Sequence, residues 1–227
     1  MSPLGNVVDP VNPQDAVNKK YVDSKVPATL PALVTALPGS PVDGQEVYYQ
    51  SPTKYTDNPT ANTSMQTAGN VWHLRYRAAA SGSYKWEFVG GSPLIASIET
   101  SVAQSSNAAG WVDLPSSAGP TITLPLGGDY EAYGVAVSSG AASANYYHQL
   151  AIMRSAVAPV AADIVSQITE VAGSVFGGIL QHAGFSYPQA MAAAGTLKLV
   201  YNNAGGTNSA LPTWGGRRIV VRPIRVG

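Results

Sequence analysis

Two alternating runs carry the clearest structural signal in this chain: Val71-Trp72-His73-Leu74-Arg75-Tyr76 and Tyr84-Lys85-Trp86-Glu87-Phe88-Val89. Successive side chains of a β-strand point to opposite faces of the sheet. On one face of each run, every side chain is therefore aromatic or leucine. Ser81-Gly82 lies between the runs and is typical of a turn. The two runs predict a β-hairpin whose aromatic side chains pair across the strands.

The residues around this hairpin extend the β prediction. Gln45–Gln50 is rich in β-forming residues and predicts a strand ahead of the hairpin. Ser51–Asn70 is polar, contains two prolines and predicts a loop. Gly90-Gly91-Ser92-Pro93 is typical of a hinge. We therefore expect residues 42–93 to form a small, aromatic-rich β module.

Residues 94–227 repeat the same signal at shorter intervals, with Gly, Ser, Asn and Pro between the runs. Short strands separated by turns favour a β-sandwich of the jelly-roll kind. We therefore expect a mainly β protein with a β-sandwich head. Residues 156–178 fit either a helix or a strand with loops, and we favour the strand. The β-prone runs are Leu94–Thr100, Gly110–Leu114, Thr121–Leu124, Gly128–Val137, Tyr146–Met153, Gly195–Tyr201 and Arg218–Val226.

The N-terminal zone predicts a short helix. Asn12-Pro13-Gln14-Asp15 combines an N-cap residue, a proline at the first helical position and an acid in the first turn. The helix would cover Pro13–Lys25, with Val17 and Tyr21 on one face. A helix this short is unstable alone in water. It therefore needs a partner surface or copies of itself.

Composition divides the chain into four expected parts. A segment rich in prolines separates the N-terminal zone from the β module, and four prolines there exclude a continuous helix or a central strand. The expected parts are residues 1–26 for attachment or oligomerisation, 27–41 as a Pro-rich spacer, 42–93 as the β module and 94–227 as the β-sandwich head.

Charge is scarce and unevenly distributed. Charged residues make up 11% of the chain, and 13 basic side chains balance 13 acidic ones. Zero net charge argues against a general nucleic-acid binder, which needs a basic surplus. Residues 101–216 carry only seven charged side chains: Asp113, Asp129, Glu131, Arg154, Asp163, Glu170 and Lys198. Interface cores are depleted in charge, so we expect this zone to contact copies of itself. A monomer covered by Ser, Thr and Asn is the alternative.

The sequence offers little that points to catalysis or to a membrane. The chain has no cysteine and none of the short motifs that cradle phosphate, activate a nucleophile or bind a metal. Glycan cleavage needs two converging carboxylates, and Asp129 follows two glycines as a turn residue would. We therefore expect no enzyme, cofactor or metal. Val171–Leu197 is long enough to span a bilayer but contains polar residues and proline, so we expect no membrane insertion.

Some side chains are candidates for contact with a receptor or a host-surface glycan. They are Tyr146, Tyr147, His148 and Trp214. Packing in the core or between subunits is the simpler role for each of them. Near the C-terminus, strict alternation predicts Arg218 and Arg222 on one face of a strand and Arg217 and Arg225 on the other. That division argues against a single basic patch.

The segment Asn6–Asp23 reads NVVDPVNPQDAVNKKYVD. It resembles a signature of bacteriophage tail-fibre and related virion proteins, roughly N-V-x-D-P-x-x-x-x-D-A-x-x-K-x-Y-V-D. The aromatic hairpin and the closing strand Arg217–Val226 are similar to parts of minor structural proteins of tailed phages. The resemblance implies a trimeric fibre whose N-terminal segment docks on the virion. The residues that it implies for docking or oligomerisation are Asp9, Pro10, Asp15, Val17, Lys20 and Tyr21.

The resemblance and the charge distribution lead to one main hypothesis. We expect a non-enzymatic structural protein of a phage virion, a homotrimeric tail fibre or spike that presents a head to the host surface. Its expected partners are copies of itself, other virion proteins and a host cell-surface glycan. A head fibre or capsid decoration protein is the first alternative. A free-standing glycan-binding or glycan-degrading protein is the second.

Overall fold

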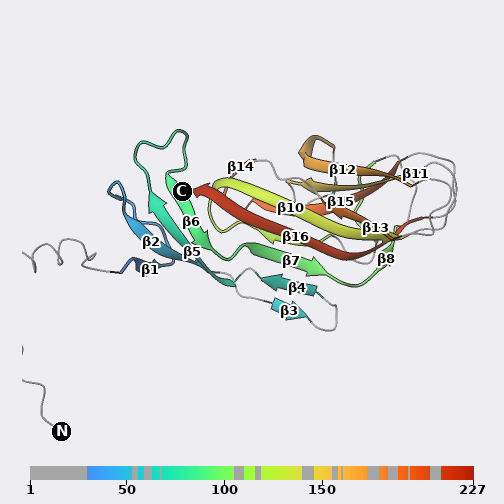
Figure 1. The fold of residues 1–227 in the computed structure, drawn as a ribbon, viewed down its shortest axis with the longest axis horizontal. Helices are drawn as coiled ribbons and strands as arrows, with labels where there is room; N and C mark the ends of the chain where they lie inside the picture. The colour runs from blue at the N-terminus through green and yellow to red at the C-terminus, as the bar shows by residue number, and fades with distance from the viewer. Residues whose placement is uncertain are drawn as a thin grey trace, which may run out of the picture. The chain divides into compact units, whose positions relative to one another are not determined.

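The computed structural model divides the chain into two units, residues 1–32 and 33–227. Figure 1 shows the strands of the described residues. The described residues contain β-strands and one 3-10 turn, and among them no helix is long and apolar enough to span a membrane. The structure describes residues 30–52, 56–58, 63–66, 68–104, 110–115, 119–139, 146–154, 158–159, 161–172, 179–183, 189–193, 195–204 and 211–227.

Within these residues, the larger of two sheets has twelve strands, in the order β1-β2-β5-β6-β16-β7-β4-β3. Four further strands, β8, β10, β13 and β14, branch from this order. β10 pairs with β13, β14 and β16, and β8 pairs with β16. The strands are β1 (Ala32–Val34), β2 (Glu46–Pro52), β3 (Thr56–Asn58), β4 (Thr63–Gln66), β5 (Ala68–Tyr76), β6 (Trp86–Gly91), β7 (Leu94–Ile98), β8 (Val102–Ala103), β10 (Gly128–Ser139), β13 (Ile179–Ala183), β14 (Gln189–Met191) and β16 (Thr213–Val226).

The smaller sheet has four strands in the described part of the chain, in the order β12-β11-β15-β9. Val112 adds an isolated bridge to Tyr201 of β15. A short 3-10 turn, Ala161–Asp163, leads directly into β12. The strands are β9 (Thr121–Thr123), β11 (Tyr146–Met153), β12 (Ile164–Ala172) and β15 (Thr196–Ala204).

The predicted aromatic hairpin is confirmed as the pair β5 and β6. Tyr76 lies opposite Trp86, and their ring centroids are 5.3 Å apart at a steep angle. Leu74 lies opposite Phe88 in the same register. The ring of Trp72 meets the ring of Phe88 edge-on at 6.4 Å. Cross-strand packing of apolar side chains therefore sets the register of this hairpin, as the alternation predicts.

The larger sheet crosses the boundary that composition suggests at residue 93. β6 hydrogen bonds with β16, and β4 hydrogen bonds with β7. Residues 33–227 accordingly form one compact unit. The prediction of a loop over Ser51–Asn70 is wrong where β3 and β4 form. Their pairing depends on β7, which comes later in the chain, and a local pattern contains no sign of it.

Both sheets contribute to one core, so the two layers pack as a β-sandwich and the mainly β fold class is confirmed. Tyr201 of the smaller sheet lies against Trp214 of the larger one, with ring centroids 5.0 Å apart. Gly134 of β10 lets the layers approach, because a Cβ there would lie 2.6 Å from the side chain of Leu199. The largest fully buried side chains include Trp72, Trp214, Tyr130, Tyr201, Leu74, Leu94, Ile122 and Leu150.

Within the head, most predicted strands are present. β11 has the predicted bounds, and β7, β9, β10, β15 and β16 overlap their predicted runs. Residues 164–172 of the ambiguous segment form β12, so the preference for a strand is confirmed there. The sequence analysis missed the short strands β8, β13 and β14. The predicted helix Pro13–Lys25 lies outside the described residues.

Two adjacent glycines of β6 differ in how closely they approach β5. Gly91 has a φ of +133°, and a Cβ there would lie 2.3 Å from the backbone oxygen of Val71. Gly90 has no atom within 4 Å of the equivalent position.

We predict that Gly91→Ala lowers the free energy of unfolding by about 2 kcal/mol or more, because overpacking and backbone strain add. Urea denaturation would measure the loss. Gly90→Ala is the matched control, and an equal loss in both variants would contradict the prediction.

Candidate functional site

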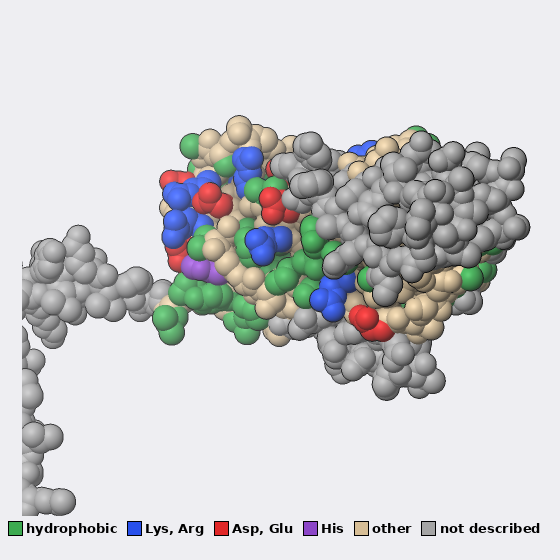
Figure 2. All heavy atoms as spheres, turned by 45° about the vertical axis from the view of Figure 1, so that its right-hand side comes forward, with side chains coloured by type: hydrophobic (Ala, Val, Ile, Leu, Met, Phe, Trp, Pro, Cys, Tyr) green, Lys and Arg blue, Asp and Glu red, His purple; other side chains and the backbone are tan. Residues whose placement is uncertain are grey.

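The outer face of the larger sheet, which points away from the shared core, carries charged side chains on β2, β5, β6, β10 and β16. On β16, Ile219 and Val221 point into the core, whereas Arg218 and Arg222 are exposed. On β10, Tyr130 is buried and Glu131 is exposed. Figure 2 shows basic and acidic side chains mixed in one area, on the left of the view, with hydrophobic side chains beside them. We treat this face as the candidate functional site.

Five charged residues of alternating sign lie in register across five neighbouring strands of this face. Asp129 of β10 pairs with Arg225 of β16, which pairs with Glu87 of β6. Glu87 pairs with Arg75 of β5, which pairs with Glu46 of β2. We call these five residues the charge row. Opposite charges on directly opposed residues of a sheet stabilise the pairing of the strands.

Every member of the charge row forms an ion pair. The Arg75 Nε donates to Glu46 Oε1 at 2.7 Å, and the His73 ring nitrogen lies 2.9 Å from the other oxygen of Glu46. Arg77 binds Glu87 at 3.1 Å, and Arg225 lies 3.9 Å from Asp129. The hydrogen bonds from Arg75 and His73 hold the pKa of the Glu46 carboxyl below its usual range. This carboxylate therefore stays ionised in mildly acidic conditions.

A β-bulge places Arg225 in the charge row. Asp129 pairs with Arg225 and Tyr130 with Pro223, so Ile224 is an extra residue on β16. A bulge shifts the alternation by one residue. Arg225 consequently shares the outer face with Arg218 and Arg222, and the prediction that it lies on the face of Arg217 is wrong. Arg217 is fully buried, and its guanidinium donates to the Thr100 carbonyl at 3.0 Å.

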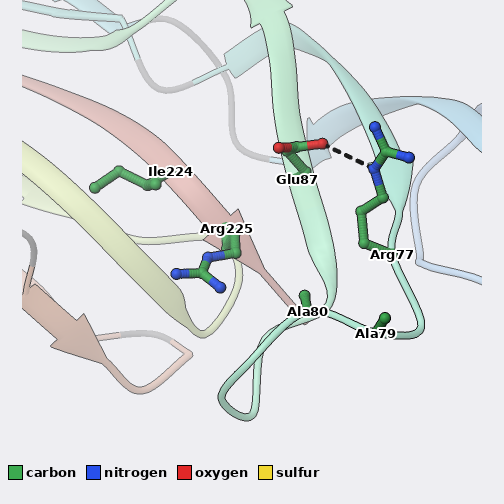
Figure 3. A pocket seen from close by; sticks show the side chains of 6 residues that line it. All are labelled: Arg77, Ala79, Ala80, Glu87, Ile224 and Arg225. Carbon is green, nitrogen blue, oxygen red and sulfur yellow. Dashed lines mark hydrogen bonds and ion pairs between the residues drawn. The ribbon is translucent and has the colours of Figure 1, made fainter.

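Two hollows open on the outer face. The larger, of about 480 Å³, is lined by Arg77, Ala79, Ala80, Glu87, Ile224 and Arg225. Figure 3 shows Glu87 joined to Arg77 on one side, with Arg225 on the other. Both arginines beside this hollow already have hydrogen-bond partners within the protein. Arg77 binds Glu87, and Arg225 donates to the Ser81 carbonyl at 2.9 Å. Its polar groups therefore mainly hold the β6 hairpin and β16 together.

The smaller hollow, of about 240 Å³, is lined by Glu131, Tyr133, Val220 and Arg222. Tyr133 is 43% exposed, which is unusual for a large aromatic side chain in the middle of a strand. Glu131 lies opposite Arg222, and Tyr133 lies opposite Val220. We call these four residues the tyrosine patch.

Two of the four residues that the sequence suggested for receptor contact, Trp214 and His148, are buried. Trp214 is fully buried, and its indole nitrogen donates to the Gln104 side chain at 3.2 Å. His148 is 5% exposed and lies 2.9 Å from the Ser138 hydroxyl. Burial lowers the pKa of His148, so the ring is neutral near pH 7. Both side chains point into the sandwich, which corrects the suggestion that they contact a receptor.

The remaining candidates fall outside what the structure describes. Tyr146 and Tyr147 begin β11, but their side chains are not among the described ones. The candidates for docking or oligomerisation also lie outside the described residues: Asp9, Pro10, Asp15, Val17, Lys20 and Tyr21.

The fold places Asp113 apart from Asp129 and Glu131, the next two acids in the sequence. Asp113 accepts two hydrogen bonds from Lys198 of the smaller sheet, at 2.8 and 3.0 Å. Asp129 belongs to the charge row, and Glu131 lines the smaller hollow. Two of these acids thus lie on the larger sheet, while the third is paired with a strand of the other layer. Among the described residues, no group of three His, Asp or Glu side chains is arranged to hold a metal ion.

Neither the charge row nor the tyrosine patch was predicted from the sequence. Each charged member of the row is visible as the polar residue of an alternating run, as Arg75 and Glu87 are. Their partners depend on which strands pair and in what register. Tyr133 and Glu131 could have been found as the outward residues of the predicted run Gly128–Val137, but nothing local to that run places Arg222 beside them.

No family model matches the sequence, and no curated protein is similar to it. Some solved structures have a weak structural similarity to this protein. An arabinose-bound α-L-arabinofuranosidase has a TM-score of 0.35 and 10% identity over 78% of this chain, which spans 27% of that enzyme. The K3 adhesin domain of Lys-gingipain from Porphyromonas gingivalis has a TM-score of 0.29 and 16% identity over 56% of this chain and 74% of its own. A structure of infectious bursal disease virus has a TM-score of 0.34 and 15% identity over 68% of this chain and 42% of its own. These values are too low to relate any of them to this protein.

The ion pairs of Glu46 predict a pH-dependent contribution to stability. Because the folded protein lowers the pKa of Glu46 from its ordinary value of 4.5, the stabilisation is present above about pH 4.5. It is lost as the pH falls through the lowered pKa. We predict that Glu46→Gln lowers the free energy of unfolding at pH 7 by a few tenths to ~1 kcal/mol, as for partly exposed ion pairs. The difference from the native protein should vanish in acid.

Chemical denaturation at pH 7 and at pH 3 would measure this difference. Glu131→Gln is the matched control, because Glu131 is an exposed carboxylate that forms no ion pair within the described residues. It should change stability little at either pH. A constant effect of Glu46→Gln at both pH values would contradict the role assigned to its charge.

Proposed function

We propose that this protein is a non-enzymatic structural component of a tailed-phage virion, a tail fibre or spike that forms a homotrimer. Its N-terminal segment docks on the particle, and its β-sandwich projects a head toward the host surface. Its partners are copies of itself, other virion proteins and a host-surface glycan, and its location is the virion.

The observation that carries this proposal is the segment Asn6–Asp23. Its resemblance to the phage signature extends over eighteen residues and includes the spaced Asp9-Pro10, Asp15, Lys20 and Tyr21. A chance match of that length is far less frequent than the match of a short motif. The scarcity of charge in residues 101–216 supports the same proposal, because a trimer buries surface that a monomer must keep solvated.

The proposed division of labour follows from the physical properties of the parts. A segment too short to fold alone gains its order only from a partner, which suits attachment to a socket on the particle. The spacer, with four prolines, would hold the head away from that socket. Three heads on one fibre would bind a repetitive host surface through avidity, even where each contact is weak.

Changes in the N-terminal segment test the docking role. We predict that deletion of residues 1–26, or the double substitution Asp9→Ala with Tyr21→Ala, prevents incorporation into virions. The sandwich should keep its unfolding midpoint, because residues 33–227 form a separate compact unit. Quantitative immunoblotting of purified particles would measure incorporation. Ser2→Ala is the control, because Ser2 lies ahead of the segment. Continued incorporation of both the deletion variant and the double variant would refute the docking role.

Solution mass tests the trimer. We predict that mass photometry of the full chain gives three times the 23.5 kDa of one chain. A single species at the monomer mass, at micromolar concentration, would contradict the trimer.

Labelling of particles tests the place of the protein on the virion. Gold-labelled antibodies viewed by electron microscopy should mark the tail. Label on the capsid would favour the head-fibre or decoration alternative instead.

A further inference from the structure

The tyrosine patch combines a hollow, an aromatic ring and two charges that form no ion pair with any described side chain. Tyr133 faces Val220, and Glu131 faces Arg222 in the next outward row of the same two strands. The hollow that they line has a volume of about 240 Å³. Sites that enclose drug-sized ligands are larger, roughly 300–1,000 Å³. This hollow therefore suits a single ring that rests on the sheet.

The charges of Glu131 and Arg222 distinguish the patch from the rest of the face. All five residues of the charge row form ion pairs. Glu131 and Arg222 are both exposed, and within the described residues neither forms an ion pair. Directly opposed residues of an antiparallel pair hold their Cβ atoms ~4.5–5.5 Å apart. A free carboxylate and a free guanidinium thus flank the same small space.

This combination matches the chemistry of a sugar. A carboxylate only accepts hydrogen bonds and a guanidinium only donates them, whereas each sugar hydroxyl does both. The exposed ring of Tyr133 and the side chain of Val220 provide an apolar surface for the C–H face of a pyranose. Tyrosine presents such a surface at a low cost in conformational entropy. The opposite charges of Glu131 and Arg222 balance, so the patch as a whole has no net charge and suits a neutral sugar.

We infer that the tyrosine patch binds one neutral pyranose ring of a saccharide. The ring stacks on Tyr133, its hydroxyls donate to Glu131, and Arg222 donates to its oxygens. This inference rests on the proposed function for its biological setting, since it names the ligand class of the head. The binding itself is a property of the purified chain and is measured without any virion.

Saturation-transfer NMR on the full-length protein tests the inference. The probes are the methyl glycosides of glucose, galactose and mannose, together with N-acetylglucosamine and short neutral oligosaccharides of each sugar. At least one probe should show transfer to the ring protons that stack on Tyr133. Tyr133→Ala should weaken binding of that probe about tenfold or abolish it. Tyr133→Phe should keep it, because the ring and not the hydroxyl makes the stack.

Further variants separate the patch from the rest of the face. Glu131→Gln and Arg222→Lys should each weaken binding, because the first removes a charged acceptor and the second removes the forked donor. Tyr48→Ala is the matched control. Tyr48, on β2, is another exposed tyrosine, and its ring lies against the ring of His73 on β5. It should leave binding unchanged.

Three results would overturn the inference. One is the absence of saturation transfer to any probe, and another is transfer that persists in Tyr133→Ala. The third is a change of oligomeric state in Tyr133→Ala, measured by mass photometry, because it would make the patch a contact between copies of the chain. Failure of the N-terminal variants to alter virion incorporation would affect the virion proposal alone and would leave sugar binding by the patch intact.

Discussion

The hydrogen bonding of β16 is the constraint on which the rest of the larger sheet depends. This last strand pairs with β6, β7 and β8, which follow one another in the chain, and with β10; all four lie far before it in the sequence. Figure 1 shows β10 and β16 side by side along most of their length. Because β16 pairs with both the aromatic hairpin and the head strands, it joins the two into one sheet. It also places Trp214, Ile219 and Val221 in the core.

The bulge between β10 and β16 gives the outer face its two chemical regions. By adding one residue at Ile224, it turns Arg225 outward beside Asp129. The charge row then runs uninterrupted from β10 to β2, and each of its charges forms an ion pair, that of Glu87 with Arg77 outside the row. On the other side of the bulge the alternation is regular, and Glu131 and Arg222 remain unpaired within the described residues. One face therefore holds a region that stabilises strand pairing and a neighbouring region with free hydrogen-bonding groups.

The sequence analysis found the strands whose pattern is local. The aromatic hairpin and β11 could be predicted because alternation of apolar and polar residues reports directly on a half-buried strand. β4 could not be predicted in this way, because its own residues do not alternate and its pairing with β3 and β7 makes it a strand. The roles of two ring side chains of the head were also ambiguous from the sequence. Trp214 and His148 suit either a binding surface or a core, and only the facing sheet, with Tyr201 against Trp214, decides for the core.

The sequence by itself determined that this protein is mainly β, where most of its strands lie and how its charge is divided along the chain. These properties follow from composition and from a two-residue period, which are both local. The tertiary structure alone decided the register, and with it the charge row, the tyrosine patch and the outward turn of Arg225. The physical reason is that a strand fixes which of its own side chains share a face, but not which side chains of other strands lie beside them. That choice requires long-range pairing, and a single bulge is enough to change it.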